Sequence, residues 1–219
     1  MTYILNIETA TKNCSVALAK DGEILFCEEI AEEGYSHAEK LHVFIQSVLE
    51  KASLSFKDLS AVAVSQGPGS YTGLRIGVSS AKGLCLALSI PLIAVDTLQV
   101  LAAQVKVNSG LIVPMIDARR MEVYTAVFDA HLQKLSDIKP EILTENSFQD
   151  LQETVYFIGD CAEKAKTVLK KENFIFLEKV IYPSAREMAL LSFNLFQQNK
   201  VESVAYFEPF YLKEFRFAK

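Results

Sequence analysis

Hydrophobic and polar positions along this chain follow two periodicities, the alternation typical of strands and the three- to four-residue spacing typical of helices. The segment YILNIE, residues 3–8, is predicted to be a buried strand. Two more strands are predicted around the Asp21-Gly22 pair, because Asp-Gly between apolar runs is a strong hairpin signal. A helix is predicted over 36–52, with four apolar residues on one face at helical spacing: Leu41, Ile45, Val48 and Leu49.

The same pattern begins again halfway along the chain. After a strand at 61–65 and a long helix at 71–89, further helices and strands alternate. A strand at 111–116 then ends in the acidic Asp117, just as the first strand ends in Glu8, and two more strands are predicted after it. The sequence therefore predicts an internal repeat of architecture with a period near half the chain.

The repeat predicts two α/β lobes, each a mixed sheet with flanking helices. We place the boundary in the polar run VKVNSG, which gives an N-terminal lobe at 1–105 and a smaller C-terminal lobe at 106–219. This layout is that of the two-lobed actin-like ATPase fold, also described as ribonuclease H-like or ASKHA. Such a fold does not define a function, so function must be argued from a site.

Charge and cysteine content narrow the possible functions. The 219-residue chain has a formal net charge of −5 and no basic run, so we expect no direct binding to nucleic acid. None of its four cysteines has the short spacing of zinc or redox motifs, and we expect reduced thiols. The N-terminal sequence is not a secretory signal and no apolar run could span a bilayer, so we expect a cytoplasmic protein without membrane association.

The segment SQGPGSYTGLRIG, residues 65–77, has the glycine content of a phosphate-binding loop. It lacks the Gly-Lys-Ser/Thr end of a P-loop, and Thr72 occupies the place of the third glycine in the dinucleotide fingerprint. Both nucleotide-binding motifs are therefore excluded. Two interpretations remain for Gly69 and Ser70: Ser70 caps the following helix, or the first amides of that helix hold an anion.

Small residues recur at every fourth position of the helix at 71–89. They are Gly73, Gly77 and Ala81, with Ser80 beside them. Glycine inside a helix costs about 1 kcal/mol relative to alanine, so the stripe needs a physical reason. Without side chains, another backbone can approach closely. The neighbour could be this chain's own sheet or a helix of another chain, and the sequence leaves both open.

Five segments, in order over residues 4–191, carry a family resemblance: LNIETATKNCSVAL, SHAEKLHVFI, GPGSYTGLRIGVSSAKGL, VPMIDARRMEVYTAVF and YPSAREMALL. Together they closely resemble the bacterial TsaB family, also called YeaZ. The resemblance implies the actin-like fold and a non-catalytic subunit. Its partner would be the paralogue TsaD, which transfers a threonylcarbamoyl group to the adenosine beside the anticodon of tRNAs reading ANN codons. A small ATPase, TsaE, would join the pair, and tRNA would be reached only through the complex.

The resemblance also suggests where the partner binds. The helices at 36–52 and 71–89 would form one exposed face that packs against the equivalent helices of TsaD, and without TsaD the same face could pair with a second copy. The expected contact residues are His37, Leu41, Phe44, Gly73, Gly77, Ser80 and Ala81. TsaD-like enzymes bind a metal through two histidines four residues apart. Thr97 and Leu101 stand at those places here, so we expect no metal and no catalytic residue.

Other polar residues are candidates for contacts with an anion, or with ATP or ADP at the interface of the complex: Thr9, Thr11, Gly69, Ser70, Arg75 and Arg119. The loop that follows Glu8 lacks the glycines of an ATPase phosphate cradle, so ATP hydrolysis by the chain alone is not expected. The alternative for the arginines Arg119 and Arg120 is a local ion pair with Asp117.

Two enzyme classes remain as alternatives. A stand-alone ATPase or kinase of the actin-like fold would turn over ATP without a partner. A peptidase would need a metal or a nucleophile, but His37 and His42 are five residues apart and point to different sides of a helix. No Ser-His-acid set follows from the order of the residues, so no catalytic residue is assigned.

Overall fold

The computed structural model describes residues 1–31 and 37–212. The chain forms two compact units, one of Met1–Val100 together with the chain from Pro183 onward, and one of Leu101–Tyr182. The first boundary lies close to the predicted one. The prediction of a C-terminal lobe that runs from 106 to the end is wrong, because the chain returns to the first unit at Pro183.

The first unit is built on five strands: β1 (Tyr3–Glu8), β2 (Asn13–Lys20), β3 (Glu23–Ala31), β4 (Ala61–Ser65) and β5 (Leu92–Val95). They form one mixed sheet in the order β3-β2-β1-β4-β5. The central β1 pairs antiparallel with β2 and parallel with β4, so that Ile7 lies between Val16 and Val64. The predicted hairpin is confirmed, since Asp21 and Gly22 turn between β2 and β3 with left-handed φ values of 51° and 88°.

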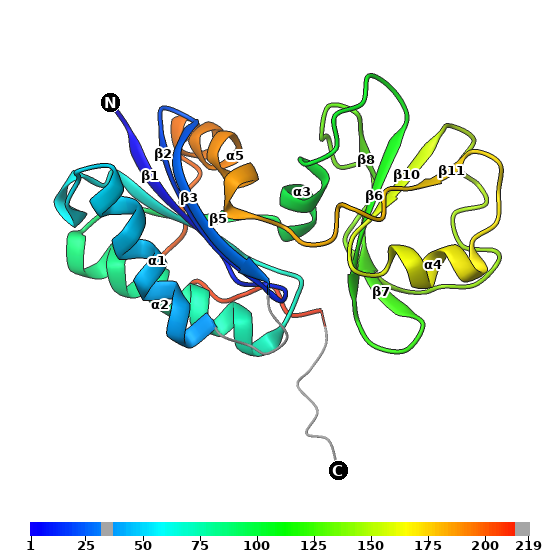
Figure 1. Cartoon of the computed structure of the whole chain (residues 1–219), viewed down its shortest axis with the longest axis horizontal. Helices are drawn as coiled ribbons and strands as arrows, with labels where there is room; N and C mark the ends of the chain where they lie inside the picture. The colour runs from blue at the N-terminus through cyan, green and yellow to red at the C-terminus, as the bar shows by residue number, and fades with distance from the viewer. Residues whose placement is uncertain (32–36, 213–219) are drawn as a thin grey trace, which may run out of the picture. The chain divides into compact units, whose positions relative to one another are not determined.

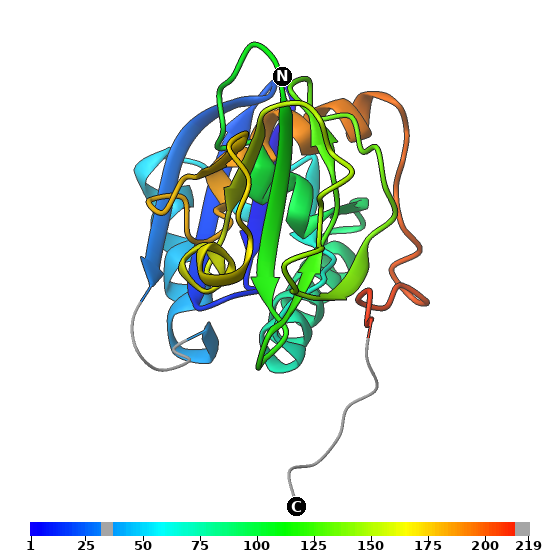
Figure 2. The same ribbon diagram turned by 90° about the vertical axis from the view of Figure 1, so that its right-hand side faces the viewer.

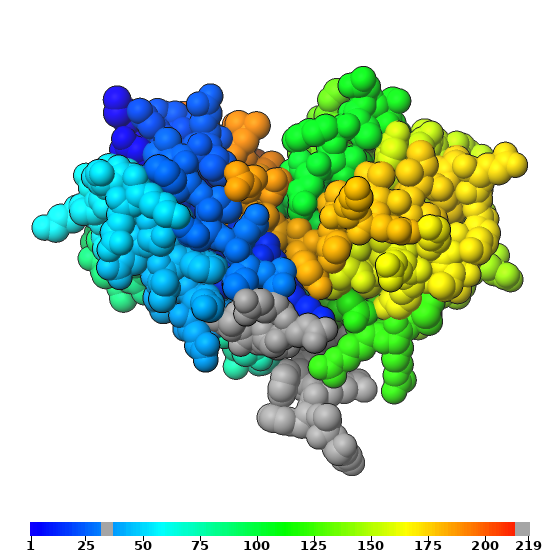
Figure 3. Space-filling model, viewed as in Figure 1, coloured from blue at the N-terminus to red at the C-terminus, as the bar shows by residue number. Residues whose placement is uncertain are grey.

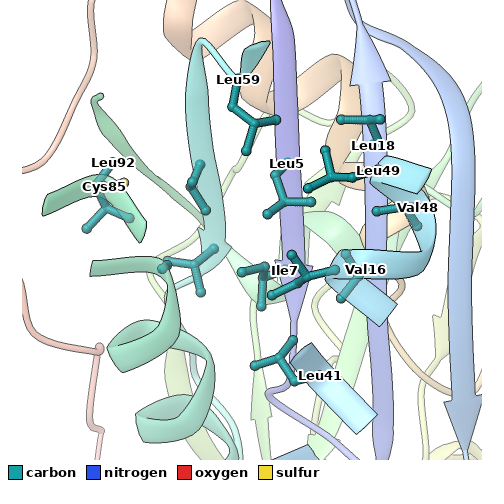
Figure 4. Close-up of a cluster of buried hydrophobic side chains, with 14 of the residues drawn as sticks. Leu5, Ile7, Val16, Leu18, Leu41, Val48, Leu49, Leu59, Cys85 and Leu92 are labelled. Carbon is teal, nitrogen blue, oxygen red and sulfur yellow. The ribbon is translucent and has the colours of Figure 1, made fainter. Parts of the chain in front are cut away.

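Helices cover both faces of this sheet: α1 (His37–Lys51) and α2 (Tyr71–Leu88) on one, and α5 (Ala185–Gln197) on the other (Figure 1). A short 3-10 turn, η1 (Phe56–Asp58), precedes β4. Because successive strand residues point to opposite faces, Ile7 packs under α1 and α2, whereas Ile4 packs under α5. Figure 4 shows side chains of α1 meeting those of β1 and β2. The predicted apolar face of α1 is confirmed by the burial of Leu41, Ile45, Val48 and Leu49.

The helix α2 begins and ends as the sequence indicates. The Ser70 hydroxyl accepts a 3.3 Å hydrogen bond from the Gly73 amide, so Ser70 is the N-cap. At the other end Ser89 adopts the left-handed conformation with φ 55°, and Pro91 follows. Of the two interpretations of Ser70, the structure shows the cap.

The second unit contains six strands and a helix: β6 (Leu111–Asp117), β7 (Glu122–Thr125), β8 (Phe128–Asp129), β9 (Lys139–Ile142), β10 (Val155–Ile158), α4 (Ala162–Val168) and β11 (Phe174–Phe176). The helix α3 (Thr97–Ala102) leads into it from β5. Its sheet has the order β11-β10-β6-β7-β9, with β6 as the long central strand (Figure 2).

The predicted internal repeat is confirmed by strand pairing. The strand β6 pairs antiparallel with β7 and parallel with β10, as β1 does with β2 and β4. The outer strands β9 and β11 complete the same order that β3 and β5 give the first sheet. One helix differs. Between β9 and β10, residues 143–154 hold only turns and bends, so the described chain has no second-unit counterpart of α1.

Candidate functional site

Glu8, the last residue of β1, opens the loop in which the sequence places a phosphate contact. Its side chain is fully buried, and Oε1 accepts a 2.5 Å hydrogen bond from the Ala10 amide. Burial raises the pKa of Glu8 to about 7, although the Ala10 amide and the Ser65 hydroxyl on β4 oppose this shift. Glu8 therefore holds its own loop in place and does not present a carboxylate to a ligand.

The buried Glu8 carboxyl should make the stability of the chain depend on pH. Its folded-state pKa of about 7 lies above the ordinary value of 4.5, so the folded state binds the proton more tightly than the unfolded state. This contribution to the free energy of unfolding is complete below pH 4.5 and is lost as the pH rises to about 7. We expect Glu8→Gln, which keeps an acceptor for the Ala10 amide, to flatten this dependence. Urea unfolding across this pH range measures it, and an unchanged slope in the variant would refute the assignment.

The loop after β1 is bonded to the start of α2. The Thr9 hydroxyl donates to the Gly73 carbonyl at 2.8 Å. The Ser70 amide, one of the first amides of the helix, donates to the Ala10 carbonyl at 2.6 Å. The helix N-terminus thus binds a carbonyl of its own chain, in the place where an anion site would need free amides.

The glycine stripe of α2 faces this same loop. A Cβ added to Gly73 would lie 2.1 Å from the Thr9 carbonyl oxygen. A Cβ on Gly77 would lie 2.3 Å from the Thr9 hydroxyl oxygen, and Ala81 is fully buried. The prediction that Gly73, Gly77 and Ala81 contact a partner is therefore wrong. The stripe exists so that α2 can pack against its own chain, and a bulky residue at Gly77 would test folding instead of docking.

His37 and Leu41 are also buried by their own chain. The His37 ring lies at the start of α1, and its Nε2 donates to the Thr11 carbonyl at 2.7 Å. Burial lowers the pKa of this imidazole, which favours its neutral form. Leu41, one turn later, is fully buried in the first core. The prediction that these two residues contact a partner is wrong, and His37 is an anchor for the loop after β1.

The remaining predicted anion contacts of the first unit are engaged within the loop or its neighbours. Gly69 lies against the loop, where an added Cβ would be 2.3 Å from the Ala10 carbonyl oxygen. The Thr11 hydroxyl accepts a 3.4 Å hydrogen bond from the Asn13 amide and is almost buried. Thr9, Thr11, Gly69 and Ser70 thus lie together, and each has a contact within the chain. That they contact an anion or nucleotide stays a prediction.

The two arginines of the predicted set belong to different units. Arg75 is exposed on α2, with its guanidinium carbon 4.2 Å from the centre of the Tyr71 ring. Arg119 lies on the turn between β6 and β7 of the second unit, with φ 72°. The predicted ion pair of Asp117 with Arg119 or Arg120 is wrong. Asp117 pairs instead with Lys164 at 2.7 Å and also accepts the Arg119 amide at 3.1 Å.

Thr97 and Leu101 have structural contacts. The Thr97 hydroxyl accepts a 2.9 Å hydrogen bond from the Gly67 amide and so ties the glycine loop to α3. Leu101 is fully buried. Over residues 1–31 and 37–212, no three His, Cys, Asp or Glu side chains gather closely enough to hold a metal ion. None of the helices in these ranges is long and apolar enough to cross a membrane.

The four cysteines are free, as predicted. Burial raises the pKa of both Cys14 and Cys85 to about 11. The thiols of these two residues are therefore protonated at neutral pH and are poor nucleophiles.

A groove of about 660 Å³ runs between α1 and α2. Figure 3 shows the side chains of α1 in light blue on the face of the first unit that is turned to the viewer. Of the predicted contact residues, Ser80 lines the groove, and Phe44 is half-buried against the first core. Most of the lining could have been found from the three- and four-residue spacing that places helix residues on one face. The lining residues are Ala38, His42, Tyr71, Thr72, Arg75, Ile76, Ser79 and Ser80.

Comparisons with known proteins first define the class. The family model described as "TsaD: tRNA N6-adenosine threonylcarbamoyltransferase" matches residues 29–215. YeaZ from Pseudomonas aeruginosa has the same fold with a TM-score of 0.85 at 23% identity, over 97% of this chain and 100% of that one. The activator of 2-hydroxyisocaproyl-CoA dehydratase from Clostridium difficile, with bound ADPNP, gives 0.51 at 12% identity, over 92% and 99%. The chain has the actin-like ATPase fold, as predicted.

Curated relatives then define the family. The tRNA threonylcarbamoyladenosine biosynthesis protein TsaB of Escherichia coli (strain K12) is 34% identical over 96% of this chain and 94% of its own length. The protein of the same name from Bacillus subtilis (strain 168) is 33% identical over 86% of each chain. This chain belongs to the TsaB family, whose members take part in tRNA threonylcarbamoyladenosine biosynthesis, and the predicted resemblance is confirmed.

Proposed function

We propose that this chain is a non-catalytic subunit in the transfer of a threonylcarbamoyl group to the adenosine beside the anticodon of tRNAs that read ANN codons. In this proposal it binds a TsaD through the groove between α1 and α2 and keeps that enzyme in its working form. TsaE joins the pair, and tRNA is bound by the complex and not by this chain alone.

The observation that carries the proposal is the closed loop after β1. Its Thr9 hydroxyl donates to the Gly73 carbonyl of α2, its Ala10 carbonyl accepts from the amide of the N-cap Ser70, and the Glu8 carboxyl is buried. An enzyme of the actin-like fold that hydrolyses ATP needs free amides and space for phosphate at such a loop. Here the loop is bonded to the helix start and lies in close contact with Gly73, which favours a supporting role over catalysis.

The groove supports the choice of partner. The match to the TsaD family model extends over residues 29–215, so a TsaD has a related fold with corresponding helices. Related folds can pair equivalent faces about an approximate two-fold axis, in the manner of an isologous dimer. Tyr71 and Arg75 line the groove, and tyrosine and arginine are enriched among the residues that dominate binding energy at protein interfaces.

Reconstitution tests this function. Purified TsaD and TsaE, with tRNA and a threonylcarbamoyl donor, should modify tRNA when this chain is added and should fall to background when it is omitted. Modification that proceeds equally well without the chain would overturn the proposal. Assays of the chain alone with ATP and common metal ions address the rival function, because steady turnover that follows the chain through purification would indicate a stand-alone ATPase.

A further inference from the structure

Residues 201–212, here called the C-terminal strap, run along the first unit and pass over α2. Figure 2 draws the strap in orange-red after α5. It begins at the sheet edge, where the Glu202 amide donates to the Leu92 carbonyl of β5 at 2.8 Å. Over α2, Lys82 Nζ donates to the Phe207 carbonyl at 2.9 Å. These bonds fix the path of a segment that contains only turns, a bend and one isolated bridge.

The end of the strap reaches two side chains of α2. The Phe210 amide donates to the Gln66 carbonyl of the glycine loop at 2.7 Å. The next residue, Tyr211, places its ring 5.0 Å from the Tyr71 ring, centre to centre. Its hydroxyl oxygen accepts a 3.4 Å hydrogen bond from Arg75 Nε, and the Arg75 guanidinium in turn lies over the Tyr71 ring. The two rings are tilted by 37°, and Tyr211, Tyr71 and Arg75 thus form one cluster of mutual contacts.

Tyr71 and Arg75 of this cluster line the docking groove, whereas Tyr211 is not among its lining residues. An exposed arginine loses considerable side-chain entropy when a partner orders it. A side chain that is already held in one conformation loses less, which strengthens binding. We propose that Tyr211 is a positioning residue of the docking surface, through which the C-terminal strap holds Tyr71 and Arg75 ready for TsaD. This inference rests on the proposed function.

The charge of the groove indicates the chemistry of the occupant. Arg75 is cationic, and although Glu208 of the strap acts on it electrostatically, the described residues that line the groove include no Asp or Glu. When a partner buries the guanidinium on docking, a carboxylate of that partner would offset the lost hydration. A second copy of this chain, paired face to face, would bring the same cationic lining against itself. We therefore assign the groove to a TsaD that places a carboxylate against Arg75.

The positioning role is measurable without TsaD. Because Arg75 lies over the Tyr71 ring, its side-chain Nε–H signal in a nitrogen-edited NMR spectrum should be shifted by the ring current. Tyr211→Ala should move this signal toward the random-coil position. Tyr211→Phe, which keeps the ring and removes the hydroxyl, should move it less. Signals that stay unchanged in Tyr211→Ala would overturn the positioning role.

The affinity for TsaD tests whether this positioning of Tyr71 and Arg75 strengthens binding. Tyr211→Ala should raise the Kd for TsaD about fivefold to tenfold, as expected for loss of an aromatic pair. Tyr206→Ala is the matched control, because Tyr206 lies on the same strap and is 86% exposed, and its Kd should equal that of the wild type. In an Arg75→Ala background, Tyr211→Ala should raise the Kd by a smaller factor than in the wild type, because only its contact with Tyr71 is left to lose; this tests the coupling even if the single variant folds less well.

The outcomes separate the two proposals. Wild-type binding to TsaD with an unchanged Kd in Tyr211→Ala overturns this inference and leaves the proposed function intact. No binding of the wild type overturns the proposed function and the inference together. If Tyr211→Ala alters only self-association in sedimentation velocity, the groove takes a second copy and the inference is overturned.

Discussion

Gly73→Ala should lower the free energy of unfolding of this chain by about 3 kcal/mol, at the upper end of what overpacking costs. The added methyl carbon would lie 2.1 Å from the Thr9 carbonyl oxygen, a backbone atom that cannot rotate away. Either α2 or the loop after β1 must move, and the 2.8 Å hydrogen bond from the Thr9 hydroxyl to Gly73 is then lost. Urea unfolding followed by circular dichroism measures the change.

Gly83→Ala is the matched control in the same helix. A Cβ added to Gly83 has no neighbour within 4 Å, so only the helix propensity changes. That substitution should raise the free energy of unfolding by about 1 kcal/mol. If both alanine variants were stabilised to the same extent, the close approach of Gly73 to Thr9 would be refuted.

Ser79→Trp should weaken binding to TsaD by about a hundredfold or more, the size of effect seen at interface hot spots. Ser79 is an exposed residue of α2 that lines the groove, and an indole ring there would fill the space in which we propose that TsaD docks. The fold should remain intact, because surface substitutions usually change stability by no more than about 0.5 kcal/mol. Isothermal titration calorimetry gives the Kd, and the reconstituted tRNA modification should fall with it.

Leu190→Trp is the control for this variant. Leu190 lies on α5, which packs on the opposite face of the first sheet, and its side chain is 60% exposed. The same bulky ring placed there should leave the Kd unchanged. Equal binding by the wild type and both tryptophan variants would show that TsaD does not dock in the groove.

Local patterns predicted most of the fold. The spacing of Leu41 and Ile45 identified the buried face of α1, and the Asp21-Gly22 pair identified the first hairpin. The acidic residues at the ends of β1 and β6 pointed to the repeat that the strand order confirms. These features depend on neighbours along the chain, which is the information that a sequence carries directly.

Long-range packing could not be predicted from local sequence patterns. Nothing in the periodicity of α5 says which sheet it covers, so the return of the chain to the first unit at Pro183 was missed. A stripe of small residues permits close approach by any backbone. The sequence therefore left open whether Gly73 and Gly77 face a partner or the chain itself, and the position of Thr9 decides it.

The candidate site was predicted only in part, because its contacts also depend on long-range packing. Residue types identified Thr9, Gly69 and Ser70 as a loop and a helix start that belong together. Their hydrogen bonds with each other became visible only in three dimensions. Arg75 was singled out as a possible contact for an anion or nucleotide, but the contact of Tyr211 with Arg75 and with its neighbour Tyr71 joins distant parts of the chain that no motif connects.

The incomplete repeat also sets the number of grooves of this kind in the described chain. The groove needs α1, and residues 143–154, at the corresponding place of the described second unit, supply no helix. The sheet is therefore duplicated in the described chain, but the groove between α1 and α2 is not. If TsaD docks in the groove as proposed, each copy would hold one TsaD at this surface, and a larger stoichiometry would need different contacts.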